Sequence, residues 1–314
     1  MELPVSKLLL DQGEELDLEV LAGEAGLERM LTNKDWNRPG LALAGYLEVF
    51  AHDRVQVFGN TETSYLHQLA PDDRARRLRA IFEFPIPCIL VTNGNEAPEE
   101  LLRLADDYRV PVLRSTVPTA LLSSMMGLYL EREFAPTTSV HAVFVDVFGL
   151  GVLIQGDSGI GKSEIALELI ERGHRLIADD AVILRKLGKN YLVGKALNDL
   201  QHYMELRGLG FVDIEQLFGF GSVREEMHVS LVVKLVRRKD GEDLERFSEI
   251  QREADFLGVK VHEYLIPVEP GRATSIIVEV AALQHRILST GRDPQRELNE
   301  QLIRQMTRAS IPKR

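Results

Sequence analysis

Apolar and polar residues follow two different periods along the chain, and together these predict an α/β protein. Short apolar or alternating runs, typical of strands, occur in the first part at 55–58, 86–92 and 110–113. Apolar residues at helical spacing predict helices at 61–69, 98–108 and 120–134. Strands that alternate with helices indicate βαβ units. We therefore predict a small amino-terminal α/β domain over residues 1–134.

The pattern changes after Ala135-Pro136, where we place the boundary to a second domain, 135–314. The apolar runs 141–148 and 151–155 meet at Gly149, and two strands joined by so short a turn are antiparallel. Since ordinary nucleotide-binding folds use parallel strands at this point, we expect a mixed sheet. Further on, we predict a strand at 176–178. An extended, proline-stiffened loop is predicted at 266–272, and a second strand at 275–280.

The segment that follows the predicted strand at 151–155 matches the phosphate-loop pattern GxxxxGK[ST], and a helical run follows it. Glycines let successive backbone N–H groups turn toward one point, where they and the positive end of a helix hold phosphate oxygens. In this pattern Lys162 reaches the β- and γ-phosphates, and the Ser163 hydroxyl binds Mg²⁺. A glycine-rich turn that ends in Gly-Lys-Ser by chance is the alternative. The predicted nucleotide-binding residues are Gly156, Asp157, Ser158, Gly159, Ile160, Gly161, Lys162 and Ser163.

Two carboxylates, Asp179 and Asp180, directly follow the predicted strand at 176–178. Such folds keep a metal-binding or base aspartate at this place, although a turn or cap pair is the alternative. Adjacent residues of a strand point to opposite faces of the sheet. Asp179 and Asp180 therefore cannot share one role unless the strand has ended before them. Further on, Glu205 offers an oxygen ligand that suits Mg²⁺, and Arg207 a positive charge for phosphate. The segment 205–214 is equally consistent with a surface turn.

Composition narrows the range of partners. The formal net charge is −11, from 37 Lys+Arg and 48 Asp+Glu, which argues against nucleic acid because phosphate backbones require a basic surface. The single cysteine, Cys88, excludes an internal disulfide framework and a multi-cysteine metal site. Neither a basic leader nor an apolar run of membrane-spanning length is evident. We expect a cytoplasmic protein without a nucleic-acid or membrane partner.

Several of these stretches, taken together, resemble the bacterial HPr kinase/phosphorylase family. In the second domain the resemblance rests on 139–141, 145–149, 156–163, 172–175, 178–180, 205–210 and 266–272. Around the first domain it rests on 38–45 and 135–139. The resemblance covers nearly the whole chain, and the second domain carries the more specific motifs.

The resemblance implies an ATP-dependent protein serine kinase that acts on HPr, the phosphocarrier of the sugar phosphotransferase system. It also implies removal of that phosphate with inorganic phosphate as acceptor, which yields pyrophosphate, and a role in regulating carbon metabolism and sugar uptake. ATP, or pyrophosphate, is the implied phosphate donor. Mg²⁺ is the implied metal cofactor. Family members are homohexamers, and their phosphate-loop domain is similar to the nucleotide core of phosphoenolpyruvate carboxykinase.

The resemblance also implies roles for single residues. The implied catalytic residues are His141, Lys162, Asp180 and Arg246. The implied metal ligands are Ser163, Glu205 and Asp179. The segment 205–214, which includes Arg207 and Gly208, is tied to both activities, and the segment 267–272, which includes Pro267, Gly271 and Arg272, to dephosphorylation.

The chain departs from the family pattern in three places. Ala142 stands where a glycine usually follows the histidine, and Glu269 stands where the proline loop usually has arginine. The sequence around Arg246 also diverges. The charge reversal at Glu269 makes the expectation of phosphorolysis weaker than that of kinase activity.

Two other functions share parts of this pattern. A small-molecule kinase or carboxykinase-like enzyme would have the same loop and metal residues, and would place phosphate on a metabolite but not on HPr. A non-catalytic nucleotide sensor would bind ATP without turnover. The sensor is disfavoured because a pure binding protein has no need of the carboxylates that follow the loop.

Overall fold

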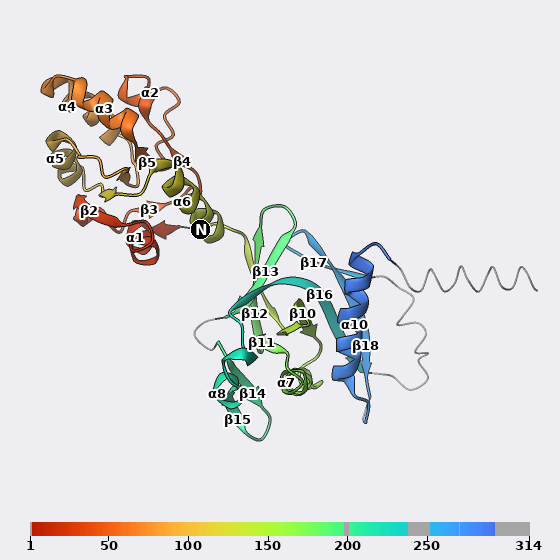
Figure 1. Ribbon diagram of the computed structural model, residues 1–314. Helices are drawn as coiled ribbons and strands as arrows, with labels where there is room; N and C mark the ends of the chain where they lie inside the picture. The colour runs from red at the N-terminus through yellow and green to blue at the C-terminus, as the bar shows by residue number, and fades with distance from the viewer. Residues whose placement is uncertain (1, 198–200, 238–251, 270, 293–314) are drawn as a thin grey trace, which may run out of the picture. The chain divides into compact units, whose positions relative to one another are not determined.

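Figure 1 shows the computed structural model, which describes residues 2–197, 201–237, 252–269 and 271–292. The chain divides into two compact units, Met1–Ala135 and Pro136–Arg314, and each is described by itself. No helix of the described residues is long and apolar enough to cross a membrane.

The described part of the first unit contains a five-stranded sheet with the strand order β2-β7-β6-β5-β4. Its strands are β2 (Leu18–Ala22), β4 (Trp36–Asn37), β5 (Val55–Phe58), β6 (Ile89–Val91) and β7 (Val112–Ser115). The last four run parallel, and β2 pairs antiparallel with β7. A separate antiparallel pair joins β1 (Leu3–Pro4) to β3 (Met30–Leu31).

Helices cover both faces of this sheet, which explains why its central strands β5 and β6 are buried along their whole length. The helices are α1 (Val5–Gln12), α2 (Gly40–Leu43), α3 (Asn60–Gln68), α4 (Pro71–Phe82), α5 (Glu99–Tyr108) and α6 (Thr119–Glu133), with a short 3₁₀ turn at Glu24–Gly26. Alternate strand residues enter two cores: Phe58 packs with side chains of α2 to α5, and Val57 with side chains of α1 and α6. The predicted strands at 55–58, 86–92 and 110–113 and the three predicted helices are confirmed, with ends shifted by a few residues.

The described part of the second unit contains a nine-stranded sheet, in which β11, β9, β10, β16, β13, β12 and β8 follow one another and β18 joins β16 to β17. Its strands are β8 (Thr137–His141), β9 (Val143–Val147), β10 (Leu150–Gln155), β11 (Arg175–Ala178), β12 (Ala181–Leu187), β13 (Tyr191–Ala196), β16 (Glu226–Arg237), β17 (Arg252–Phe256) and β18 (Val259–Val268). The predicted mixed sheet is confirmed, because β16 runs parallel to β10 and β18 while β9 pairs antiparallel with β10.

The turn between β9 and β10 consists of Phe148 and Gly149, whose φ angles are 55° and 81°. Positive φ at both central residues is typical of a two-residue hairpin turn whose twist matches the strands. The predicted glycine turn therefore lies where the pattern placed it. It delivers β10, whose apolar residues are buried, directly to the start of the glycine loop.

Two helices of the second unit, α7 (Lys162–Glu171) and α10 (Thr274–Ser289), pack on one face of the sheet. Leu169 of α7 and Val278 of α10 share a core with Ile154 of β10, so the helix after the glycine loop is held by both neighbours. The remaining elements are the hairpin β14 (Tyr203–Leu206) and β15 (Gly210–Asp213), the short helix α8 (Ile214–Phe218) and a 3₁₀ turn at Phe220–Ser222.

The strand predicted at 275–280 is wrong, because this segment lies inside helix α10. Ile276, Ile277, Val278 and Val280 are β-branched, which favours a strand locally. Burial instead follows a helical period, with Ser275, Val278 and Ala282 turned inward. Packing on the sheet thus overrides the local preference.

The predicted loop at 266–272 is wrong in its first part, because Ile266, Pro267 and Val268 end strand β18. Pro267 pairs with Val236 of β16, while the described pairing of β17 with β18 extends only to Glu263. Within the described residues Pro267 thus pairs with one neighbouring strand only, and there it disrupts no second ladder.

The ring of Phe144 on β9 is fully buried and fills space left by two glycines. A methyl group at Gly194 or Gly151 would lie 2.7 Å or 2.9 Å from this ring. We predict that Phe144→Ala lowers the free energy of unfolding by about 3–5 kcal/mol, since a large buried ring leaves a cavity that the sheet cannot close. Urea unfolding measures this, and Phe211→Ala, at a side chain that is 67% exposed, is the control. A loss below about 1 kcal/mol in Phe144→Ala would contradict this packing.

Candidate active site

The glycine loop lies between β10 and α7, and its backbone takes conformations that favour glycine. Gly159 and Gly161 have φ angles of 75° and 102°, and helix α7 begins at the next residue, Lys162. Such turns direct backbone N–H groups to one side, and α7 adds its positive amino-terminal end. The geometry of this loop is suited to an anion.

Lys162 is buried, and its amine lies folded back on the loop. It donates to the carbonyl oxygens of Gly156 and Asp157 at 3.0 Å and 3.3 Å, and lies 3.1 Å from Nε2 of His141. Because an ammonium group has no acceptor, Lys162 donates to His141 as well. It follows that Nε2 of His141 is the acceptor nitrogen and that Nδ1 carries the proton of the neutral ring.

Nδ1 of His141 lies 2.9 Å from Oδ1 of Asp180 and donates to it. His141 thus connects Lys162 to Asp180 in one hydrogen-bonded chain. The side chains of His141 and Asp180 are 53% and 72% exposed, so the Asp180 end of this series of hydrogen bonds is open to a large substrate.

Asp179 faces the other way, toward the start of helix α7. Ser163 Oγ donates to its two carboxylate oxygens at 3.0 Å and 3.3 Å, and the backbone N–H of Glu205 donates at 3.1 Å. Burial raises the pKa of the Asp179 carboxyl and the charge of Asp180 adds to this, whereas hydrogen bonds from Ser163 and from the backbone N–H groups of Glu205 and Asp180 oppose it. Strand β11 has ended at Ala178 and Asp180 has a φ of 67°, and the two carboxylates reach different partners, Ser163 and His141.

Among the three predicted metal ligands, Ser163 and Asp179 lie together, while Glu205 reaches the pair through its backbone N–H. The described residues contain no group of three or more His, Cys, Asp and Glu side chains that could hold a metal ion. A hydroxyl and one carboxylate are oxygen donors that fit Mg²⁺, which keeps several of its water ligands.

Arg207 lies against the glycine loop, at the turn of the β14–β15 hairpin. A methyl group at Gly159 would clash with its guanidinium group, so the missing side chain of this glycine admits the arginine. Gly208 has a φ of 87° and open space around it, which indicates a backbone role in the turn. The hairpin therefore brings a positive charge to the loop.

The remaining predicted residues are not joined to this group. Within the described ranges, no hydrogen bond or ion pair links Pro267, Gly271 or Arg272 to the glycine loop. Gly271 and Arg272 lie between β18 and α10. Arg246 lies outside the described residues.

Sequence reasoning missed a charged cluster that fastens the far end of α7. Glu279 of α10 accepts from Arg172 Nε and Nη2 at 2.8 Å and 2.7 Å, and its Oε1 lies 3.0 Å from His174 Nε2. The Glu279 side chain is only 11% exposed. A glutamate on the face of α10 that also carries the buried Ser275, Val278 and Ala282 was the available signal. The cluster ties the helix that begins at the glycine loop to α10.

Comparisons with known proteins agree with this picture. The model of the HPr Serine kinase C-terminal domain matches residues 132–302, and that of the HPr Serine kinase N terminus matches residues 3–130. HPr kinase/phosphorylases of Bacillus cytotoxicus and Bacillus anthracis are each 39% identical over 290 residues, covering 92% of this chain and 94% of the relative. The solved structure of the Hpr(Ser) kinase/phosphatase from Coxiella burnetii is 34% identical, with 52% of this chain and 99% of that chain covered and a TM-score of 0.46.

With these matches, the fold and the site define a bifunctional enzyme of the kinase/phosphorylase class. The chain belongs to the HPr kinase/phosphorylase family, as the resemblance of its motifs implied.

We predict that Glu279→Gln lowers the free energy of unfolding at pH 7 by about 2 kcal/mol, since a buried acceptor of charged hydrogen bonds is lost. Hydrogen bonds from Arg172, followed by His174, hold the pKa of the Glu279 carboxyl below its usual 4.5 against the effect of burial. This stabilisation is present above pH 4.5 and is lost as the pH falls through the lower folded pKa. The difference in free energy of unfolding between Glu279→Gln and wild type should therefore shrink as the pH falls below 4.5.

Denaturant unfolding between pH 7 and pH 3.5 measures this difference. The matched control is Glu171→Gln, an exposed glutamate at the end of the same helix, which should change stability by less than about 0.5 kcal/mol. Equal effects of the two variants would show that the cluster contributes nothing specific.

A second prediction concerns Asp179, whose carboxyl has a pKa above its usual 3.8 because of burial. A raised pKa means that the folded state favours the protonated carboxyl. The stabilisation of the folded state that comes from this protonated carboxyl is lost as the pH rises through the folded pKa. Asp179→Asn should therefore raise the melting temperature at pH 7 by about 2 °C without nucleotide, and by less at pH 4. Thermal unfolding at both pH values is the measurement. A lower melting temperature at pH 7 would be the opposite of this expectation.

Proposed function

We propose that this enzyme phosphorylates a serine of the phosphocarrier HPr with ATP and removes that phosphate by phosphorolysis, with inorganic phosphate as acceptor and pyrophosphate as product. Membership of the family supports this substrate, since the relatives are named for HPr. The observation that carries the proposal is the hydrogen-bonded chain from Lys162 through His141 to Asp180, beside the glycine loop.

The glycine loop is proposed to bind ATP, or pyrophosphate, as a phosphate loop within a domain similar to the nucleotide core of phosphoenolpyruvate carboxykinase. The positive φ angles of Gly159 and Gly161 support this, together with the position of Arg207 against the loop. Lys162 would exchange its contacts with Gly156 and Asp157 for phosphate oxygens.

Mg²⁺ is the proposed cofactor, and Ser163 and Asp179 would hold it, with Glu205 as the third proposed ligand. When bound, the ion neutralises charge on the β- and γ-phosphates. Burial raises the pKa of the Asp179 carboxyl, and a bound cation would offset the cost of keeping this carboxylate charged.

In the kinase direction Asp180 would accept the proton of the serine hydroxyl as its oxygen attacks the γ-phosphorus of ATP, and ADP leaves. His141 donates to Asp180 and so fixes the carboxylate at the open side of the site. Because Asp180 is exposed, a serine on the surface of a protein can reach it. Arg246 keeps its predicted catalytic role as part of this proposal.

In the phosphorolysis direction inorganic phosphate would attack phosphoserine, and a protonated Asp180 would return its proton to the departing serine oxygen. One carboxyl group then serves both directions. Pro267, Gly271 and Arg272 remain the proposed segment for this reaction, and Gly208 with Arg207 a segment for both. Glu269 stands in the same segment where the family usually has arginine, so this segment supports the phosphorolysis half of the proposal less strongly than the kinase half.

Self-assembly into a homohexamer is also part of the proposal. Along α10, Ile276, Val280, Leu283 and Ile287 are 45%, 55%, 41% and 42% exposed, at spacings of four, three and four residues. Such spacing forms an apolar stripe that packs well against another helix, which supports association of copies through α10.

We further propose that the enzyme acts in the cytoplasm, where it regulates carbon metabolism and sugar uptake through the phosphorylation state of HPr. The single cysteine, Cys88, is buried and free, as suits a reducing compartment. The net charge of −11 supports a protein rather than a nucleic-acid partner.

We predict that Asp180→Asn reduces phosphate transfer from ATP to HPr by about 10²- to 10⁴-fold, the usual contribution of a general base. The affinity for ATP should change less than about threefold, because Asp180 hydrogen-bonds to His141 through its side chain and to Ala142 through its backbone carbonyl, and within the described part of the chain no hydrogen bond joins it to the glycine loop. Transfer of labelled phosphate with Mg²⁺ and purified HPr measures the first quantity, and calorimetry the second. Asp107→Asn, at an exposed residue of the first unit, is the charge-matched control. Full activity of Asp180→Asn would exclude its role as base.

A further inference from the structure

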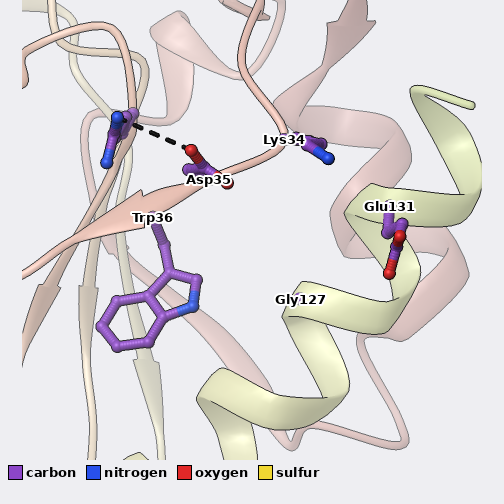
Figure 2. A pocket seen from close by; sticks show the side chains of 6 residues that line it. Lys34, Asp35, Trp36, Gly127 and Glu131 are labelled. Atoms are coloured by element: carbon purple, nitrogen blue, oxygen red, sulfur yellow. Dashed lines mark ion pairs between the residues drawn. The ribbon is translucent and has the colours of Figure 1, made fainter. Parts of the chain in front are cut away.

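The first unit contains a hollow that has no part in the proposed reaction. Its volume is about 370 Å³, within the range of small-ligand sites. It opens between the segment that leads into β4, the start of β5 and the carboxyl-terminal half of helix α6 (Figure 2). Its lining residues are Lys34, Asp35, Trp36, Arg54, Gly127 and Glu131.

Trp36 provides the apolar surface of this hollow. One side of its side chain packs against the core beneath the sheet, and the residue is only partly buried. In Figure 2 the indole hangs from β4 into the space in front of the α6 turn that carries Gly127. Among the described residues no hydrogen bond to the indole N–H is formed, so both a flat surface and a donor are available.

Gly127 keeps the opposite wall open. It lies inside the fifteen-residue helix α6, where glycine is less favourable than alanine. A methyl group at this position would meet nothing within 4 Å, so neither packing nor backbone conformation requires a glycine. What the glycine does provide is free space facing Trp36.

The charged groups around the hollow are of both signs. Arg54 and Asp35 form a loose ion pair at 3.6 Å. Neither Lys34 nor Glu131 has an ion-pair partner in the described part of the chain, and they come from opposite walls, the loop and the helix. One cation and one anion, together with an aromatic surface in the same hollow, match a ligand that carries both charges and an apolar group.

We propose that this hollow binds a free α-amino acid with an apolar or aromatic side chain. The carboxylate of the ligand would face Lys34, its ammonium group would face Glu131, and its side chain would lie on the Trp36 indole beside Gly127. A ligand with only negative charge would pair with Lys34 but would leave the negative charge of Glu131 without a partner, which disfavours phosphate esters.

The chain has a single tryptophan, so the emission of Trp36 reports on this hollow alone. The full-length protein is titrated with each proteinogenic amino acid except tryptophan and tyrosine, and in parallel with inorganic phosphate, with excitation selective for tryptophan. We expect a saturable change with at least one apolar or aromatic amino acid and none with phosphate. Isothermal calorimetry on the same pairs detects binding that leaves the emission unchanged.

Gly127→Leu fills the space with a side chain that α6 tolerates, and should abolish binding while circular dichroism and melting temperature show an intact fold. Lys34→Met and Glu131→Gln should each weaken binding about tenfold, the loss expected for one charged hydrogen bond. Glu99→Gln, at an exposed residue of α5, should bind as wild type.

Three results would overturn the proposal. The first is the absence of saturable binding of any amino acid by both methods. The second is unchanged binding in Gly127→Leu, which would place the ligand elsewhere. The third is saturation by phosphate alone, which would assign the hollow to anions.

Discussion

The second unit depends on a constraint of its backbone. Between a buried strand and a packed helix, the chain must turn so that its N–H groups face one side, and Gly159 and Gly161 do this with positive φ angles. The turn is held from both ends, since Val152, Leu153 and Ile154 of β10 are buried and α7 packs against both the sheet and α10. Without these two supports the loop would have no fixed shape, and Lys162 no fixed place.

The rest of the site is arranged around that loop by residues distant in the sequence. The turn after β11 brings one carboxylate to Ser163 and the next to His141. The β14–β15 hairpin places Arg207 over Gly159. Asp179 is sheltered and Asp180 is exposed, so two adjacent residues of the same type have different environments. Different environments allow one to meet a cation and the other a protein substrate.

Much of this was predictable from sequence because the signals are local. The phosphate-loop pattern, the turn at Gly149 and the carboxylates after 176–178 are each fixed by a few neighbouring residues. Contacts between distant segments were not predictable in this way. The cluster of Glu279 with Arg172 and His174 joins positions more than a hundred residues apart. The β-branched residues of 275–280 favour a strand locally and conceal the helical period of burial that packing on the sheet imposes. The chain from Lys162 through His141 to Asp180 required the sheet to bring β8 beside β12.

The most direct test of this account is a crystal structure of the protein with a non-hydrolysable ATP analogue and Mg²⁺. The account predicts that the triphosphate lies in the glycine loop, that the Lys162 amine has left the carbonyl oxygens of Gly156 and Asp157 for the β- and γ-phosphates, and that the γ-phosphate faces Asp180. A nucleotide bound elsewhere, or a Lys162 amine still on its own loop with the triphosphate present, would contradict it.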